Sequence, residues 1–309
     1  MLSCSTCWNC TRHTKGEDML QEILDLGFEW VELGHGIRLS LMEGVQRYYD
    51  AGKVQFSTLH NFCPLPVEIT RPAPDCYQYS SHRDPERERA VKLSFQTIDF
   101  AKRLGAKLVV LHLGRVPIDQ YTDKLVAMAE TGEHLSRKYV RLKLEAVQQR
   151  EKKAPLYLQR AKECLLRVVD HATKMGIKLG VEGRQCYEEI PTELELSKLL
   201  EEINAPEVVG YWHDFGHIQI KENLGFVDHA EWLAYISKRM FGGHLHDTGW
   251  PGRDHMPPFT GNIDYDKLIP LIPKTLPLVW EMGPRRKAAE IVESLEKWKT
   301  KFGTFGGFQ

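Results

Sequence analysis

The sequence predicts an α/β protein, a (β/α)8 barrel built as a single domain over residues 1–309. Short apolar runs bounded by turn residues alternate with amphipathic stretches along the whole chain, eight such runs occur, and no linker divides them. Repeated strand–helix units imply parallel strands, and eight units favour a closed barrel. An open doubly wound sheet is the alternative, but no G-x-G-x-x-G motif follows the first apolar run.

The expected strands are the apolar runs themselves. In chain order they are residues 2–8, 28–33, 53–60, 106–114, 177–183, 207–214, 241–247 and 277–283. Helical patterns fill the intervals, most plainly at 17–27, 87–105, 157–176 and 288–303. Each of these four patterns ends in the glycine that commonly follows a helix, which supports the boundaries.

Two segments interrupt the alternation. Residues 61–83 are rich in proline, and we expect them to form an extended loop over one end of the barrel. Residues 117–153 insert extra helix between the fourth and fifth strands. The basic run at 137–153 could hold a phosphate backbone, but its helical spacing is more typical of a solvated face. The Gly/Phe-rich end, 302–309, is of low complexity.

Composition argues against charged or membrane partners. The 41 Lys and Arg nearly balance the 42 Asp and Glu, so no overall field would attract nucleic acid or an anionic membrane. No signal-peptide pattern begins the chain, and no run of about 18 apolar residues occurs. The seven scattered cysteines suit a reducing compartment. We therefore expect a cytoplasmic protein.

Three of the cysteines, Cys4, Cys7 and Cys10, have the spacing of iron–sulfur ligands. The fourth cysteine and the proline of the common ferredoxin pattern are missing. The favoured interpretation is that these residues belong to the first strand, where small side chains pack inside the fold.

Polar residues mark the carboxyl ends of most expected strands. From the third strand to the eighth they are His60, His112, Glu182, Asp214, His244 and Glu281. Such a side chain is costly to bury unless it is paired or bound to metal. All strand ends of a parallel barrel share one face, so these residues should converge. The set of oxygen and nitrogen donors suits one divalent ion, Mn²⁺, Mg²⁺, Co²⁺ or Zn²⁺.

A second set of residues lies near these ends. His217 and His255 are additional candidates for metal or substrate binding, with Asp254 beside His255. For His246 and Asp247 we favour a role in orienting the metal ligands through hydrogen bonds.

The candidates for substrate binding are Glu32, Arg184, His246, Arg253 and Trp212. Arg184 and Arg253 could clamp a phosphate or carboxylate, or could pair with nearby acids such as Glu32 and Asp254. Glu32 could in turn pair with Arg38 or Arg184. Trp212 could stack on a sugar face or lie in the core.

At these residues the sequence resembles the xylose isomerase-like TIM-barrel superfamily, which joins sugar and sugar phosphate isomerases and epimerases with apurinic-site endonucleases of the endonuclease IV type. The most specific pieces are AKRLGAKLVVLHLG, the glutamate of LGVEG, D-x-x-H in HDFGH, H-x-x-D in HLHD, HMPPFTGNID and the glutamate of the last strand. The resemblance extends from VELGHG to VWEMG, with the insertion at 117–153 outside it.

The resemblance to the ketose epimerases implies a single metal held by Glu182, Asp214, His244 and Glu281. It also implies that Glu182 and Glu281 form the acid–base pair. Removal of a proton beside a carbonyl produces an enediolate, whose charge a divalent cation stabilises. One carboxylate would take the proton and the other would return it on the opposite face. The expected substrate is a small carbohydrate, and such proteins are frequently homo-oligomers.

The endonuclease branch is one alternative, and it implies three zinc ions. Its larger ligand set would add His60, His112, His217 and His255, which in sugar enzymes contact substrate hydroxyls instead. The third zinc site departs from the pattern, because Arg253 stands where its acidic ligand is expected. The balanced charge also disfavours DNA. A lyase or dehydratase on the same barrel remains open, and ligand binding without catalysis is the least favoured alternative.

Overall fold

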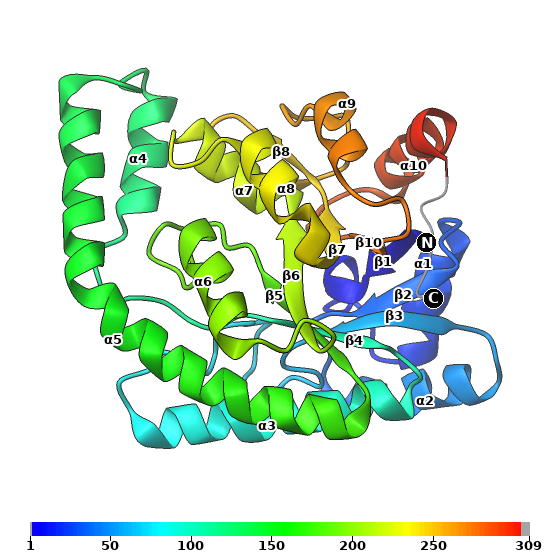
Figure 1. Cartoon of the computed structure of the whole chain (residues 1–309). Coiled ribbons are helices and arrows are strands. Elements are labelled where there is room, and N and C mark those ends of the chain that lie inside the picture. Colours follow the sequence, from blue (N-terminus) through cyan, green and yellow to red (C-terminus); the bar gives the residue numbers. More distant parts are fainter. Residues whose placement is uncertain (1, 304–309) are drawn as a thin grey trace.

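The computed structural model describes residues 2–303, and eight parallel strands close into a barrel (Figure 1). Around the barrel the strands run in the order β1-β10-β7-β6-β5-β4-β3-β2. The prediction of a (β/α)8 barrel, a TIM barrel, is therefore confirmed. Residues 304–309 of the Gly/Phe-rich end lie outside the described residues, and the single-domain assignment stays a prediction.

The barrel strands are short and buried. They are β1 (Leu2–Ser5), β2 (Trp30–Leu33), β3 (Gln55–His60), β4 (Leu108–Leu111), β5 (Lys178–Glu182), β6 (Val209–Asp214), β7 (Met240–Leu245) and β10 (Leu278–Trp280). None begins or ends more than one residue outside its expected range. The first expected strand is shortened, because Thr6–Trp8 form a 3₁₀ turn in which the Ser5 hydroxyl accepts the backbone N–H of Cys7.

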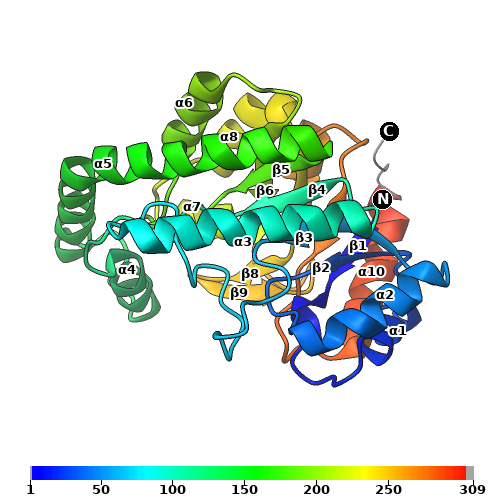
Figure 2. The ribbon, with the colours of Figure 1, turned by 90° about the horizontal axis from the view of Figure 1, so that it is seen from below.

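Helices cover the outside of the barrel. They are α1 (Gly16–Asp25), α2 (Met42–Asp50), α3 (Asp84–Arg103), α4 (Tyr121–Glu130), α5 (Arg137–Met175), α6 (Glu193–Ile203), α7 (Phe215–Asn223), α8 (His229–Ile236), α9 (Tyr265–Leu268) and α10 (Ala288–Phe302). Figure 2 shows α3 and α5 running side by side across one side of the barrel. No described helix is long and apolar enough to cross a membrane.

Apolar side chains fill the centre of the barrel. Trp212 is fully buried in a cluster with Leu108, Val110 and Val279, from β4 and β10. Its ring lies edge-on to His244, with 5.2 Å between the ring centroids. Because apolar side chains fill the interior, the polar residues at the strand ends lie at the mouth of the barrel.

The helical insertion differs from its expected form. The basic run and the helix expected at 157–176 are one continuous helix, the 39-residue α5, with Pro155 inside it. Figure 1 shows that α5 bends along its course, as expected where a proline removes a backbone hydrogen bond. With α4 it forms an arm that packs on α7 through Leu125, Tyr139 and Ile220.

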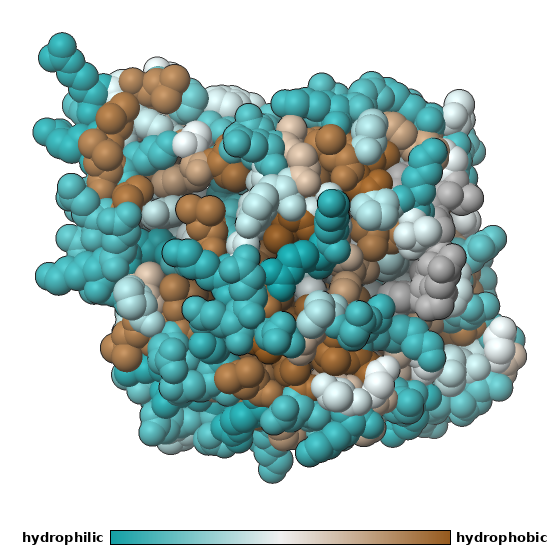
Figure 3. Space-filling view, in the orientation of Figure 1, coloured by the Kyte–Doolittle hydropathy of each residue, from teal (hydrophilic) through white to brown (hydrophobic). Residues whose placement is uncertain are grey.

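The outer side of this arm is partly apolar. Leu135 is 66% exposed and Leu144 is 57% exposed. Figure 3 shows brown, hydrophobic side chains gathered over this end of the molecule. The basic run therefore does not form a uniformly charged face.

A two-stranded antiparallel hairpin, β8 (Asp247–Gly249) and β9 (Arg253–Met256), was not expected from the sequence. It follows β7 directly and pairs Gly249 with Arg253. The Asp247 carboxylate accepts backbone N–H groups from Gly261 and Ile263, which ties the hairpin to the following loop. The hairpin thus places Asp254 and His255 beside the barrel mouth.

Candidate metal centre

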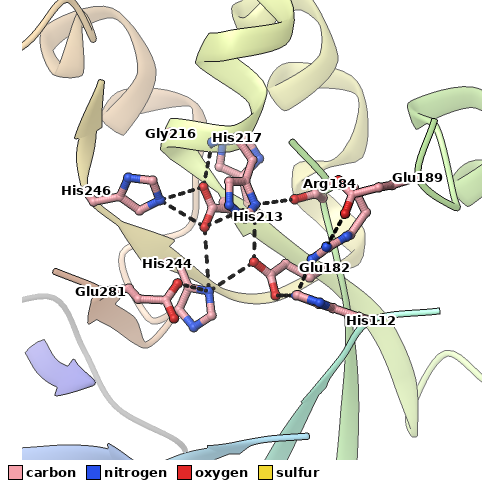
Figure 4. A network of polar contacts seen from close by, with 12 residues as sticks. His112, Glu182, Arg184, Glu189, His213, Gly216, His217, His244, His246 and Glu281 are labelled. Atoms are coloured by element: carbon pink, nitrogen blue, oxygen red, sulfur yellow. Dashed lines mark hydrogen bonds and ion pairs between the residues drawn. The ribbon is translucent and has the colours of Figure 1, made fainter. Parts of the chain in front are cut away.

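Four side chains meet at the carboxyl ends of neighbouring barrel strands. Glu182 ends β5, Asp214 ends β6, His244 lies near the end of β7, and Glu281 directly follows β10. Each offers one donor atom, and all four donor atoms lie within 4.8 Å of one another. Figure 4 shows Glu182 and Glu281 turned toward His244, and all four side chains are buried.

His244 is at the centre of this group. Its Nδ1 atom is 3.3 Å from a carboxylate oxygen of Glu182 and 3.3 Å from one of Glu281. Its Nε2 atom is 3.1 Å from Oε2 of Glu32, and Thr58 donates a 2.7 Å hydrogen bond to the same oxygen. The buried Glu32 therefore orients His244, and it pairs with neither Arg38 nor Arg184, the two partners considered from the sequence.

Asp214 has two structural roles. It is the N-cap of α7, because its Oδ1 atom accepts the backbone N–H of His217 at 2.7 Å. The same oxygen lies 2.9 Å from Nε2 of the fully buried His246. The end of β6, the start of α7 and the His246 imidazole together hold the Asp214 carboxylate in place.

The surroundings of Glu182 include both expected histidines and an arginine. His60 Nε2 is 3.1 Å and His112 Nε2 is 2.7 Å from Glu182 Oε2. Arg184 contacts His112 Nε2 and forms ion pairs with Asp75 and Glu189, and Figure 4 shows it beside His112 and Glu189. Since a guanidinium already lies against His112 Nε2, a further cation on this side of Glu182 is electrostatically disfavoured.

The opposite side of the site holds three more imidazoles. His217, His246 and His255 each offer a nitrogen, and these nitrogens lie within 4.8 Å of one another. Asp254 joins them, at 3.1 Å from His246 Nδ1 and 3.0 Å from His255 Nδ1. This group contains a carboxylate after all, one position later than the resemblance to the endonucleases requires.

The members of the central group shift one another's pKa values. Burial raises the pKa of Glu182, but His112 and His244 outweigh burial and hold that pKa well below its usual range. Burial also raises the pKa of Glu281, which His244 and His255 bring well below its usual value. In turn, burial lowers the pKa of His244, but Glu281 and Glu32 raise it well above its ordinary value. A divalent cation could replace the proton that His244 then holds.

The donor chemistry fits such a cation. Three carboxylates and one imidazole provide hard and borderline donors, and neither Lys nor Arg belongs to the four. A buried cluster of three carboxylates is unfavourable without a compensating charge. The four residues predicted from the resemblance are thus brought together in a group with the composition of a divalent metal site.

A cavity of about 850 Å³ opens beside this group. Its walls include Glu281 and, from the hairpin, Arg253, Asp254 and His255. Among the residues expected to bind substrate, Arg253 lines this cavity, whereas Arg184 is held in ion pairs and Trp212 lies beneath His244.

Several residues of the site were missed in the sequence. Asp75, which holds both His112 and Arg184, comes from the extended loop at 61–83. His35 lies next to His60, with 5.1 Å between the ring centroids, and lines the cavity together with Cys7. His35 follows the second strand closely, so its position near a strand end was the available signal. Asp75 has no such signal, because its loop carries no periodic pattern.

The three N-terminal cysteines do not share one environment. Cys4 is fully buried within β1, whereas Cys7 and Cys10, the latter only 1% exposed, both line the cavity. The Cys7 sulfur lies within 4.8 Å of donor atoms of His35 and Glu281, and among the described residues the three cysteines do not form a group of this kind. The interpretation of this segment as strand holds for Cys4, and the 3₁₀ turn carries Cys7 toward the site.

The fold and the site together define a (β/α)8-barrel protein with a buried centre of carboxylates and imidazole suited to a divalent cation. A sequence profile of the xylose isomerase-like TIM barrel family matches residues 20–300 of the chain. The chain therefore belongs to this family.

One curated relative is an uncharacterized protein, y4fM, of Sinorhizobium fredii (strain NBRC 101917 / NGR234). It is 26% identical over 197 residues, which cover 64% of this chain and 53% of that protein. The chain thus spans about half the length of this relative.

Solved structures of similar fold include several epimerases. A D-tagatose 3-epimerase-like protein is 18% identical, with a TM-score of 0.68 and 97% of each chain covered. The 3-keto-D-glucoside 4-epimerase YcjR from E. coli is 13% identical, with a TM-score of 0.68 and coverage of 97% of this chain and 98% of that chain. The IOLI protein with a bound zinc atom is 13% identical, with a TM-score of 0.66 and coverage of 98% and 97%. At these identities the likeness shows the fold.

Proposed function

We propose that this protein is a divalent-metal-dependent sugar isomerase or epimerase that moves a proton at a carbon beside a carbonyl. One observation carries the proposal. Glu182 and Glu281 come from strands on either side of β7, and each places a carboxylate oxygen 3.3 Å from His244 Nδ1. A substrate seated over His244 would have a carboxylate on each side.

These two carboxylates provide the acid and the base. One takes the proton from the carbon beside the carbonyl, and the electron pair of the broken C–H bond moves into an enediolate. The other carboxylic acid donates a proton to the opposite face of that carbon in epimerisation, or to the neighbouring carbon in isomerisation. The pKa values of Glu182 and Glu281 both lie well below their usual range, so either carboxylate can serve as the base, and the other must take up a proton from water before it acts as the acid.

Glu182, Asp214, His244 and Glu281 would hold the metal, one Mn²⁺, Mg²⁺, Co²⁺ or Zn²⁺. When bound there, the cation would act as a Lewis acid toward the substrate oxygens on which negative charge develops. We assign Glu32 and His246 to orientation of His244 and Asp214, from their contacts at 3.1 Å and 2.9 Å. His60, His112 and His217 contact Glu182, and His255 lines the cavity. These four imidazoles would donate hydrogen bonds to substrate hydroxyls. Trp212 supports His244 from below.

Metal content and proton exchange test this function. Elemental mass spectrometry on the untagged protein and on Glu182→Ala should find about one divalent ion per chain, lost in the variant. Ketoses, keto-sugars and sugar phosphates are then incubated with the wild type in D₂O. NMR should detect deuterium at the carbon beside the carbonyl and the appearance of an epimer or isomer. Absence of exchange in every sugar, with metal bound, would contradict the proposal.

Phosphodiester cleavage is a second candidate, because three neighbouring groups could hold metal. They are the central four residues, the group of His60, His112 and Glu182, and the group of His217, His246 and His255. Two or three zinc ions per chain, together with cleavage of DNA at an abasic site, would favour this activity. Arg184 argues against it, since its guanidinium contacts His112 within the second of these groups.

A further inference from the structure

Three arginines line the cavity that opens beside the candidate metal centre. Arg253 comes from β9, and Arg285 and Arg286 follow β10. Arg253 and Arg285 are exposed, and Arg286 is half-buried. In the described part of the chain, none of the three guanidinium groups lies within 4.0 Å of a carboxylate oxygen.

Their donors are largely unused. Arg253 donates from Nε to the Met256 sulfur at 3.2 Å, a weak acceptor, so the rest of its guanidinium remains available. Arg285 makes no hydrogen bond to the described residues. Arg286 differs, because its Nε donates to the His255 backbone carbonyl at 3.1 Å and ties the loop after β10 to the hairpin.

The acids of the same cavity are already neutralised. Asp254 is paired with His246 and His255, at 3.1 and 3.0 Å. Glu281 is paired with His244 at 3.3 Å. The inner wall is therefore balanced within itself, and the uncompensated charge of the cavity is the positive charge of the arginines.

We propose that Arg253 and Arg285 form a subsite for an anionic group of the substrate, a phosphate or a carboxylate. The proposal rests on the proposed function, because it places the anion at the outer end of a sugar whose carbonyl end reaches Glu281. Guanidinium groups match both oxyanions through paired N–H donors. A cavity of about 850 Å³ has room for a sugar that carries such a group.

Binding of simple anions tests this subsite without any turnover. Inorganic phosphate, and separately glucuronate with glucose as its neutral match, are titrated calorimetrically into the whole protein as purified with its metal. The variants are Arg285→Gln and the double variant Arg253→Gln/Arg285→Gln, both at exposed positions that tolerate substitution. The control is Arg141→Gln, an exposed arginine of α5 that does not line the cavity. Arg286 is left unchanged because it positions His255.

We expect saturable binding of at least one anion, weakened about tenfold or more in the double variant and unchanged in Arg141→Gln. Binding of phosphate would identify a phosphate subsite. Binding of glucuronate but not of glucose would identify a carboxylate subsite. The subsite is rejected if neither anion binds saturably, if the double variant binds as tightly as the wild type, or if the control is weakened equally. The double-variant comparison also separates this subsite from an anion that binds the metal directly.

Because these titrations measure binding alone, they fail independently of the proposed function. Anion binding without deuterium exchange would contradict the epimerase and leave the subsite intact. Deuterium exchange into neutral ketoses without anion binding would support the epimerase and reject the subsite.

Discussion

Histidines lie on two sides, or flanks, of the candidate metal centre, one beside Glu182 and the other beside Asp214. The two flanks differ in the charged side chains that these histidines contact. On the flank of Glu182, His112 contacts the guanidinium of Arg184, which is itself held by Asp75 and Glu189. On the flank of Asp214, His217, His246 and His255 surround a carboxylate, Asp254. Histidines alone do not define a metal site. On the first flank a histidine lies against a guanidinium, whereas on the second flank the histidines pair with a carboxylate.

The largest expected effect comes from the residues between the flanks. Glu182→Gln and Glu281→Gln should each lower the rate of substrate proton exchange by about 100-fold to 10,000-fold, since an amide neither takes nor returns a proton. The exchange is measured by NMR in D₂O on variants whose metal content equals that of the wild type. A variant with metal and unchanged exchange would show that its carboxylate is not the acid or base.

Removal of Arg184 should lower the stability of the protein and change how many metal ions bind on the first flank. Arg184→Met leaves Asp75 and Glu189 without their cation, and we expect the free energy of unfolding to fall by about 3 kcal/mol, at the lower end for a buried pair because Asp75 is 32% exposed. The same change should allow a second divalent ion to bind near His112 and Glu182.

Denaturant unfolding and metal counts measure both effects, with Arg184→Lys as the control that keeps the positive charge. A metal count that stays unchanged in Arg184→Met would show that the guanidinium does not exclude a second ion.

On the second flank, Asp254→Asn should weaken metal binding by about tenfold to 100-fold, the usual effect of losing a residue that orients a ligand. Asp254 holds His246, and His246 holds Asp214. The affinity is measured by competition with a chelator. Asp266→Asn, at an exposed acid of α9 paired with Lys301, provides the matched control. A larger loss, with release of a second ion, would indicate that Asp254 is itself a ligand.

The smallest effect is a dependence of metal affinity on pH. Although burial lowers the pKa of His244, its carboxylate neighbours raise that pKa well above the ordinary value, so His244 holds a proton at neutral pH. A metal ion must displace this proton. Affinity should therefore fall as the pH falls, by up to about tenfold per pH unit for one proton. Calorimetry in buffers of different ionisation enthalpy counts the protons released, and a count of zero would contradict the assigned charge.

The sequence predicted the barrel and the convergence of six polar strand ends, and the resemblance singled out four of these six. Apolar runs mark the strands, and a carboxylate or imidazole at the end of such a run has few positions other than the barrel mouth, as for Glu182 and His244. The contact between Arg184 and His112 could not be predicted, because these residues are 72 positions apart and their approach depends on the loop that carries Asp75.

The hairpin after β7 was missed for a related reason. Its strands have three and four residues, too few to show an alternating pattern. Its position depends instead on the Asp247 carboxylate, which accepts backbone groups from Gly261 and Ile263. Arg253 was expected to bind substrate, and its place on a cavity wall with Arg285 follows from this tertiary arrangement.

Asp214 illustrates a wider consequence of the way this centre is built. It begins α7 and holds His246 before any ion is present, and His244 is likewise held between Glu32 and Glu281. Stripping the ion with a chelator should therefore leave a folded apoprotein with its ligands in register. Such a protein can be recharged with a different ion without refolding, so a single preparation could be loaded with manganese, cobalt and zinc in turn.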